Sequence, residues 1–256
     1  MADSAASNPM RSLSRAIQVL EQLQRYDGPR RLKVIAEDCG MSSPTALRIL
    51  RVLCGSGLVN QSDKSYSVGP GALPAARSYL ETDPLPRVCR PVLQRLAADT
   101  EVTASLYSRL GFERVLIERS IGSAELGYEL PQGRRLPLTV GAGGKALIRD
   151  LPDGELASVL AASVTLRHEA GDLTLDRLKE RLTLGGDGYS LSSDEREIGV
   201  VSVAVPIPTP KGWAASESIA LSAPISTVTA ADLTRRVPQL HLAARTIAES
   251  LPSRHA

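Results

Sequence analysis

The sequence predicts an α+β protein in two parts, and three observations support this fold class. Residues 11–70 contain three short helical patterns followed by a polar hairpin. One more helical stretch then ends at a proline-rich break at residues 83–86. Residues 86–256 alternate strand and helix patterns over a length that is typical of a single domain.

The first helix is predicted after a short polar segment. Residues 1–10 are small and polar, and we expect them to be disordered. From Leu13 onwards, apolar side chains recur at helical spacing on one face, and Asp27-Gly28-Pro29 ends the helix. This expected apolar face comprises Leu13, Ala16, Ile17, Leu20 and Leu23.

Two shorter helices follow. The second is expected to bury Leu32, Ile35, Ala36 and Cys39, and to end at Gly40. In the third, Ser43 is expected to be the N-cap and Pro44 the first helical residue. This third helix buries Leu50 and Leu53, together with either Ala46 or Leu47, and ends at Gly55-Ser56-Gly57.

A hairpin completes the first part. Residues 58–61 and 65–68 read as strands around the polar turn Ser62-Asp63-Lys64. The order of helix, helix, tight turn, helix and hairpin is that of a winged helix-turn-helix domain, whose third helix can enter a major groove. We assign residues 11–70 to this domain and residues 71–85 to a linker helix.

The second part, residues 86–256, mixes strands and helices. The expected strands cover residues 102–108, 114–120, 199–207 and 216–223. The expected helices cover residues 144–149, 153–162, 173–185 and 230–250.

Composition excludes several classes of protein. The 30 basic and 28 acidic residues leave a net charge of +2. This balance excludes a protein that coats nucleic acid with a uniformly basic surface. No apolar run is long enough to span a membrane and no signal peptide is visible, so we expect a cytoplasmic protein. The three cysteines, Cys39, Cys54 and Cys89, have no CxxC spacing, which argues against a disulfide scaffold or a zinc site. We expect no metal and no cofactor.

Charge is unevenly distributed, and this points to DNA. Residues 1–70 hold nine Lys and Arg against six Asp and Glu, whereas the rest is nearly neutral. A small basic module of this kind is suited to phosphate contacts. The expected DNA-binding residues are Arg15 on the first helix, Lys64 in the hairpin turn, and Ser42, Ser43, Thr45 and Arg48 at the start of the third helix. The alternative is that these charges are merely solvated and the domain docks a protein.

No catalytic motif is found. The three histidines, His168, His241 and His255, lie outside any nucleophile motif, and neither HExxH nor GxSxG occurs. The run from Ser192 to Glu195 reads more simply as a loop that caps a helix or strand end than as a nucleophile with acids. The glycine-rich turn at 141–144 lacks the spacing of a P-loop. We therefore expect no enzymatic activity.

Two features of the second part nevertheless favour ligand binding. Free amides at the turn before Lys145 could receive a carboxylate, although simple close packing of the turn is the alternative. In the two late strands, bulky residues alternate with small ones. The small face carries Ser202, Ala204, Ser218, Ala220 and Ser222. Such a face leaves room for a ligand held by hydroxyl groups, or for a closely packed helix.

Motifs in both parts resemble the IclR (isocitrate lyase regulator) family of bacterial transcription factors. In the first part they are Arg11-Ser12-Leu13, Thr45-Ala46-Leu47-Arg48-Ile49-Leu50 and Tyr66-Ser67-Val68-Gly69. In the second they are Gly133-Arg134-Arg135-Leu136-Pro137-Leu138, Gly144-Lys145-Ala146, Gly188-Tyr189-Ser190 and Ser202-Val203-Ala204-Val205-Pro206. The resemblance runs in order from about residue 11 to residue 250.

The resemblance implies a GAF-like effector domain joined by the linker helix to the winged helix. It implies dimers, or dimers of dimers, on palindromic double-stranded operator DNA, with a small-molecule effector, for which we expect a carboxylate. Family effector contacts fall here on Ala142, Gly143, Ser192, Ser202, Ala220 and Ser222. Many members have an acidic residue at Ser192 and a serine at Ala220, so the expected pocket is less polar.

The sequence therefore predicts a ligand-responsive transcriptional regulator, most often a repressor in this family. One alternative is a metabolite-binding protein or enzyme with an appended helical module, which would bind or convert a ligand without regard to DNA. Another is a winged-helix protein adaptor, which would retain a partner protein and show no salt-dependent affinity for DNA.

Overall fold

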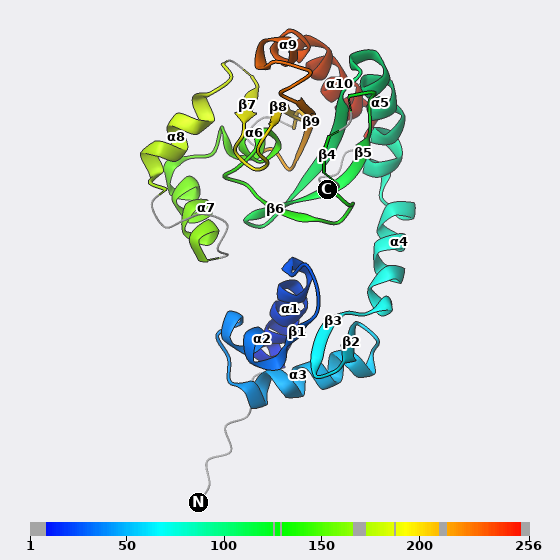
Figure 1. Ribbon diagram of the computed structural model, residues 1–256, viewed down its shortest axis with the longest axis vertical. Coiled ribbons are helices and arrows are strands. Elements are labelled where there is room, and N and C mark those ends of the chain that lie inside the picture. Colours follow the sequence, from blue (N-terminus) through cyan, green and yellow to red (C-terminus); the bar gives the residue numbers. More distant parts are fainter. Residues whose placement is uncertain are drawn as a thin grey trace, which may run out of the picture. The chain divides into compact units, whose positions relative to one another are not determined.

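The chain folds into two compact units that divide between Thr82 and Asp83. The computed structural model describes residues 9–124, 126–128, 130–165, 173–186, 188–209 and 214–251 (Figure 1). Most of the segment that we expected to be disordered, residues 1–10, lies outside the described residues. Its last two residues already belong to the first helix, which begins at Pro9.

The first unit has the predicted order of helices and hairpin. Its helices are α1 (Pro9–Arg25), α2 (Leu32–Asp38), α3 (Ser43–Gly55), the short 3-10 helix η1 (Pro70–Ala72) and α4 (Leu73–Thr82). Its strands are β1 (Arg30–Arg31), β2 (Val59–Ser62) and β3 (Ser65–Val68), paired in the order β1-β3-β2. The two-residue strand β1 was not predicted, because two residues carry no periodic signal.

The core of the first unit is small and lies between α1, α2, α3 and the hairpin. Leu50 of α3 and Ile35 of α2 are fully buried, and Ala46 rather than Leu47 faces this core. The expected face of α1 was partly wrong. Val19 and Leu23 are its buried residues, whereas Leu13 and Ile17 are about half exposed. The helix is rotated so that Val19 and Leu23, four residues apart, meet the core.

The second unit is built on a six-stranded antiparallel sheet in the order β6-β5-β4-β9-β8-β7. Its strands are β4 (Thr103–Leu110), β5 (Glu113–Ser120), β6 (Arg135–Pro137), β7 (Ser190–Ser193), β8 (Val200–Pro206) and β9 (Glu217–Pro224). The sequence predicted four of these strands and missed β6 and β7, which are short and bounded by loops.

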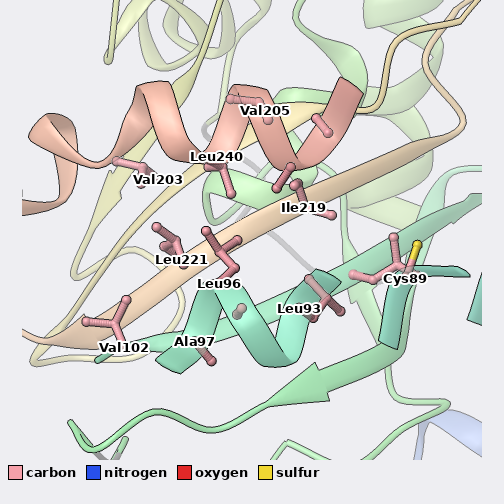
Figure 2. Packing of buried hydrophobic residues seen from close by; sticks show 14 of the residues in the cluster. Cys89, Leu93, Leu96, Ala97, Val102, Val203, Val205, Ile219, Leu221 and Leu240 are labelled. Atoms are coloured by element: carbon pink, nitrogen blue, oxygen red, sulfur yellow. The ribbon is translucent and has the colours of Figure 1, made fainter. Parts of the chain in front are cut away.

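Helices cover both faces of this sheet (Figure 1). On one face lie α5 (Pro84–Thr100), α9 (Ala230–Arg235) and α10 (Val237–Ser250). Figure 2 shows that residues of α5 and α10 pack there against the bulky side chains of β8 and β9, such as Val203 and Leu221. The alternation predicted for these two strands is confirmed.

The opposite face of the sheet, with the small residues, is covered by α6 (Ala142–Ile148). Helices α7 (Asp153–Thr165) and α8 (Leu175–Thr183) form the outer layer beyond α6. Helix α6 begins two residues earlier than predicted, so Gly143 and Gly144 lie inside it. A Cβ atom on Gly144 would lie only 2.5 Å from the carbonyl oxygen of Leu138. Glycine at this position therefore lets α6 pack closely against the segment around Leu138.

The single helix expected at residues 230–250 is two helices. It breaks at Arg236, between α9 and α10, because Pro238 has no amide hydrogen and starts a new helix instead of extending the old one. Within the described residues, no helix combines the length and the apolar character needed to cross a bilayer.

Candidate functional site

The start of α3 presents the residues predicted to contact DNA. Ser42, not Ser43, is the N-cap residue, because Ser43 is already the first residue of helix α3. The hydroxyl of Ser42 pairs with that of Thr45 at an oxygen-to-oxygen distance of 3.0 Å. Ser42, Ser43 and Arg48 are exposed and Thr45 is half-buried, so one turn of helix offers hydroxyl groups and a guanidinium to solvent.

Two further predicted residues lie on other elements of the first unit. Lys64 is exposed in the two-residue turn between β2 and β3, where its φ of 65° and the φ of 47° at Asp63 give the left-handed geometry of a tight hairpin. Arg15 is half-buried on α1. In the part of the chain that the structure describes, neither Arg48 nor Lys64 has a side-chain partner, so both charges are available.

The second unit contains a cavity of about 30 Å³ between the small face of the sheet and the start of α6. All six residues that we expected to contact an effector line this cavity. They are Ala142, Gly143, Ser192, Ser202, Ala220 and Ser222. They come from α6 and from three neighbouring strands, so the fold brings together residues up to 80 positions apart in the chain.

Hydroxyl groups form a row across the floor of this cavity. Ser192 is the register partner of Ser202, and Ser202 is that of Ser222. On the next strand, Thr103 pairs with Ser222, and its buried hydroxyl has no hydrogen-bond partner among the described residues. Since paired residues project from the same face of a sheet, these four hydroxyls point to one side.

Arg114 is a residue of the cavity wall that the sequence analysis missed. It lies on β5, it is only 2% exposed, and its guanidinium carbon sits 5.1 Å from the centre of the Tyr107 ring. Its Nη1 donates hydrogen bonds to the carbonyl oxygens of Pro137 and of Val140, the latter at 2.8 Å. Its Nε has no partner within the described residues. Burial lowers the pKa of Arg114 to about 10.

Arg196 provides a second guanidinium in the lining of the cavity. It lies in the loop after β7, stacks 4.6 Å from the centre of the Tyr128 ring, and donates a hydrogen bond to the Tyr128 hydroxyl. Burial raises the pKa of Tyr128, and Arg196 partly offsets this effect. Two arginines thus contribute charge to a lining in which Ser192 and Ala220 contribute little, and the expectation of a pocket less polar than that of many family members stays a prediction.

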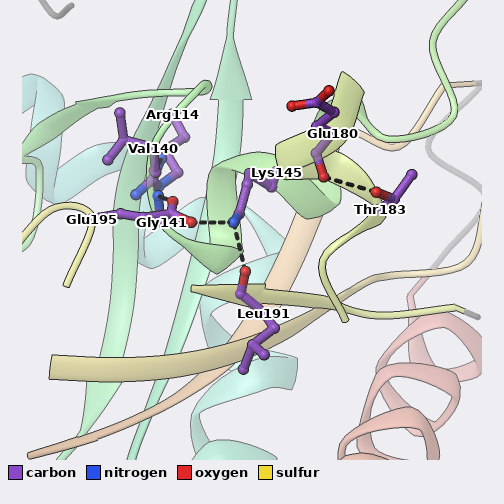
Figure 3. A network of polar contacts seen from close by, with 8 residues as sticks. All are labelled: Arg114, Val140, Gly141, Lys145, Glu180, Thr183, Leu191 and Glu195. Carbon is purple, nitrogen blue, oxygen red and sulfur yellow. Dashed lines mark hydrogen bonds and ion pairs between the residues drawn. The ribbon is translucent and has the colours of Figure 1, made fainter. Parts of the chain in front are cut away.

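A buried ion pair holds the same loop against α6 (Figure 3). The ammonium group of Lys145 is fully buried, and it donates to the carboxylate of Glu195 and to the carbonyl of Leu191. Burial lowers the pKa of Lys145, and Glu195 counteracts this shift. The other carboxylate oxygen of Glu195 accepts from the amide of Gly141 at 2.9 Å. One of the amides that we expected to be free for a ligand is thus taken by the protein itself.

Of the three histidines that lie outside any nucleophile motif, only His241 belongs to the described residues. His168 and His255 lie outside the described residues, and His241 is half-buried on α10, on the face of the sheet opposite the cavity. Within the described ranges, no cluster of His, Cys, Asp and Glu could hold a metal ion. The run from Ser192 to Glu195 ends strand β7 and anchors its loop, which agrees with the simpler of the two interpretations.

Two family models match the chain. Residues 12–63 match the IclR helix-turn-helix domain, and residues 77–249 match the bacterial transcriptional regulator IclR C-terminal domain. The chain belongs to the IclR family of bacterial transcriptional regulators. Family membership confirms the winged helix-turn-helix domain and the α+β fold class, and it identifies a DNA-binding regulator.

Named relatives of this IclR-family protein are repressors. The HTH-type transcriptional repressor AllR of Klebsiella pneumoniae is 27% identical over 229 residues, which are 88% of this chain and 84% of AllR. AllR of Escherichia coli K12 is 26% identical over 237 residues, 89% of this chain and 85% of that protein. These relatives are regulators of transcription and not enzymes by name.

Solved structures of IclR-family proteins share the fold. A regulator from Brucella abortus superposes with a TM-score of 0.80 at 22% identity, covering 94% of this chain and 92% of its own. An IclR homologue from Microbacterium hydrocarbonoxydans, solved in complex with 4-hydroxybenzoate, has a TM-score of 0.65 at 17% identity, covering 93% and 99%.

Proposed function

We propose that this IclR-family regulator is a cytoplasmic repressor that binds a palindromic operator as a dimer or a dimer of dimers. In the proposal, a small molecule in the cavity of the second unit changes the affinity of the first unit for DNA. The observation that carries the proposal is the pairing, in one chain, of a helix-turn-helix domain with a cavity-bearing domain. Repression is the activity for which both AllR relatives are named.

The proposed DNA contacts follow from exposure and chemistry. Arg48 can place two parallel donors on the edge of a guanine, and the hydroxyls of Ser42, Ser43 and Thr45 can reach bases or phosphates. Lys64 at the hairpin tip and Arg15 on α1 supply charges suited to phosphate contacts. These groups would fix the register of α3 in a major groove.

The proposed effector site is the cavity lined by Ala142, Gly143, Ser192, Ser202, Ala220 and Ser222. A bound small molecule can change DNA affinity only if it binds the DNA-competent and DNA-free states unequally. The structural relative solved with 4-hydroxybenzoate supports a small-molecule site in a domain of this fold. The proposal therefore predicts reciprocal coupling, in which operator DNA changes the affinity for the effector by the same factor.

A gel-shift titration tests the DNA half of the proposal. The purified full-length protein should retain a fragment of the DNA upstream of its own gene, and the logarithm of the affinity should fall linearly with the logarithm of salt concentration. A competitor fragment of equal length from inside the gene should bind more weakly. Absence of retention at low ionic strength would contradict DNA binding and favour a protein adaptor instead.

A further inference from the structure

A second, larger hollow lies on the far side of the sheet from the cavity. Helices α5 and α10 pack side by side on that face, and an open groove of about 260 Å³ runs between them. Its floor is apolar and includes Val92 and Leu96 of α5 and Ala243 of α10. An apolar floor of this size that borders on water is a surface that a second molecule can cover.

Leu242 of α10 lies at the rim of this groove and is 60% exposed. The neighbouring apolar residues of the helix, Leu240, Ala243 and Ile247, follow helical spacing and are buried. Figure 2 shows Leu240 among the core residues that α10 packs with α5 and the sheet. Leu242 does not belong to that buried face, so the fold of a single chain leaves an apolar side chain uncovered beside an apolar groove.

The rim also carries two opposite charges that do not meet within the chain. Arg95 and Asp99 are the charged residues among those that line the groove, and both are exposed. They lie one helical turn apart, a spacing at which Arg77 and Glu81 of α4 form an ion pair at 2.7 Å. The aspartate side chain is one carbon shorter than that of glutamate, and within the described residues Arg95 and Asp99 form no ion pair. Both charges are thus available to a second molecule.

We propose that this groove is an interface between two copies of the chain, related by a two-fold axis that crosses α5 between Arg95 and Asp99. Such an axis reverses the direction of α5, so Arg95 of one copy lies opposite the partner's Asp99 and the same ion pair forms twice. The lining has no net charge. This suits a second copy better than DNA or an anionic membrane, which bind surfaces with surplus positive charge.

The two kinds of side chain have different roles in this interface. Covering the groove floor and Leu242 removes apolar surface from water, which drives association. The rim charges stay partly hydrated, so they mainly set the alignment of the two copies and exclude other alignments. The inference rests on the proposed function in taking the protein to be a dimer or a dimer of dimers, and it names one surface that joins the copies.

The first experiment measures the mass of the full-length protein in solution without DNA, by sedimentation over a range of concentrations. Leu242→Asp places a charge in the apolar contact. Where wild type is fully assembled, the mass of this variant should fall by half, from a dimer to a single chain or from a dimer of dimers to a dimer. Leu184→Asp is the matched control, because Leu184 is 52% exposed outside the groove, and it should keep the wild-type mass. Circular dichroism checks that both variants are folded.

The second experiment tests the alignment by reversing charges. Arg95→Asp puts two carboxylates opposite each other, and Asp99→Arg does the same with two guanidinium groups. Each should raise the Kd of self-association by at least about tenfold. The double variant Arg95→Asp/Asp99→Arg restores opposite charges across the axis, and its Kd should return to within about threefold of wild type. Arg177→Asp, an exposed residue on α8, is the control and should leave the Kd unchanged.

Three results would overturn the inference. They are a wild-type protein that stays a single chain at every concentration, a folded Leu242→Asp variant with wild-type mass, and a double variant that associates no better than the single ones. The second of these would leave the groove to a different protein. Failure of the inference is distinct from failure of DNA binding, because sedimentation is measured without DNA. A protein that retains DNA while Leu242→Asp keeps its mass loses the inference alone, and a protein that assembles through the groove but ignores DNA loses the proposed function alone.

Discussion

The start of α3 in the first unit and the cavity of the second unit both present arginine, but at opposite solvent exposure. Arg48 is exposed and has no partner in the described chain, so its charge faces solvent. Arg114 is 2% exposed, is held by carbonyls and a ring, and has a pKa lowered to about 10 by burial. Without a partner, an exposed charge lowers the stability of the fold very little, because water solvates it. A buried charge lowers the stability of the fold until a group of opposite charge contacts it.

The difference also sets what each region can discriminate. A hydrated arginine gains affinity mainly by releasing counterions from DNA, which depends on salt and not on the shape of the partner. A buried arginine is poorly screened by salt and tolerates only a group of the right charge and size. The first unit therefore needs several weak contacts, while the second can respond to one small molecule.

The largest expected effect is the loss of the buried pair beneath the cavity loop. Glu195→Gln leaves the Lys145 ammonium buried without its counter-charge, and we expect the free energy of unfolding to fall by about 3–5 kcal/mol. Without Glu195 the folded-state pKa of Lys145 drops further below its ordinary value. Between that lowered value and 10.5 the unfolded chain binds more protons, so the stability of the variant should rise with pH in this window.

Urea unfolding of wild type and variant across alkaline pH measures this effect. Glu197→Gln, two residues along the same loop and exposed, is the control and should change stability by less than about 0.5 kcal/mol. Adding Lys145→Met to Glu195→Gln should recover much of the loss, because the orphaned charge is then gone. Equal stability of Glu195→Gln and wild type would remove the contrast between buried and exposed charge.

A core substitution in the first unit tests whether that unit can lose its fold while the second unit keeps its own. Leu50 is fully buried between α1, α2 and the hairpin, so Leu50→Ala should cost about 2–5 kcal/mol. This unit has a small core, and DNA retention should therefore be lost while binding at the cavity persists. Val52→Ala is the control, because Val52 is 73% exposed on the same helix. Gel shift and titration calorimetry on the same preparations would show whether the two units fail separately.

Local patterns predicted the first unit well, because its elements depend on neighbours in the chain. Gly40, with a φ of 60°, ends α2 as expected, and the turn at Asp63-Lys64 has the tight geometry that joins two strands. Apart from the missed strand β1, the errors there concern the N-cap residue of α3 and the exposed face of α1, and they are shifts of one residue or of part of a turn. Both depend on how the helices pack, which periodicity alone does not specify.

The second unit shows where sequence reasoning ended. Alternation in β8 and β9 correctly indicated a small face with hydroxyls, since that signal is local. Arg114 was missed because its place beside the cavity depends on pairing between distant strands. Strand β4 pairs with both β5 and β9, and this pairing places Arg114 beside residues about a hundred positions later. Nothing in the residues next to Arg114 distinguishes it from the other arginines of the chain.

The next prediction concerns the exposed arginine itself. If Arg48 contacts a base, Arg48→Ala should weaken operator binding by about 1–3 kcal/mol and relax base preference at one position. Lys64→Ala should instead weaken all DNA fragments alike and reduce the slope of affinity against salt by about one, as a phosphate contact would. Gel shifts with the operator and a scrambled fragment separate the two. Arg177→Ala in the second unit is the control, and an equal loss in all three variants would contradict base contact by Arg48.

The smallest expected effect concerns a buried titratable group outside the cavity. It tests whether burial and nearby positive charges also lower a pKa there. His241 on α10 has its pKa lowered by burial and by the neighbouring charges of Arg245 and Arg149. The folded state therefore releases this proton more readily than the unfolded state, whose pKa is near 6.5. Stability from this group is present above that value and is lost as pH falls through the folded-state pKa. Thermal unfolding from pH ~8 to ~5 should show a smaller decline for His241→Gln than for wild type. Parallel curves for the two proteins would mean that the imidazole is as well hydrated as Arg48, and the contrast between the units would then be confined to the cavity.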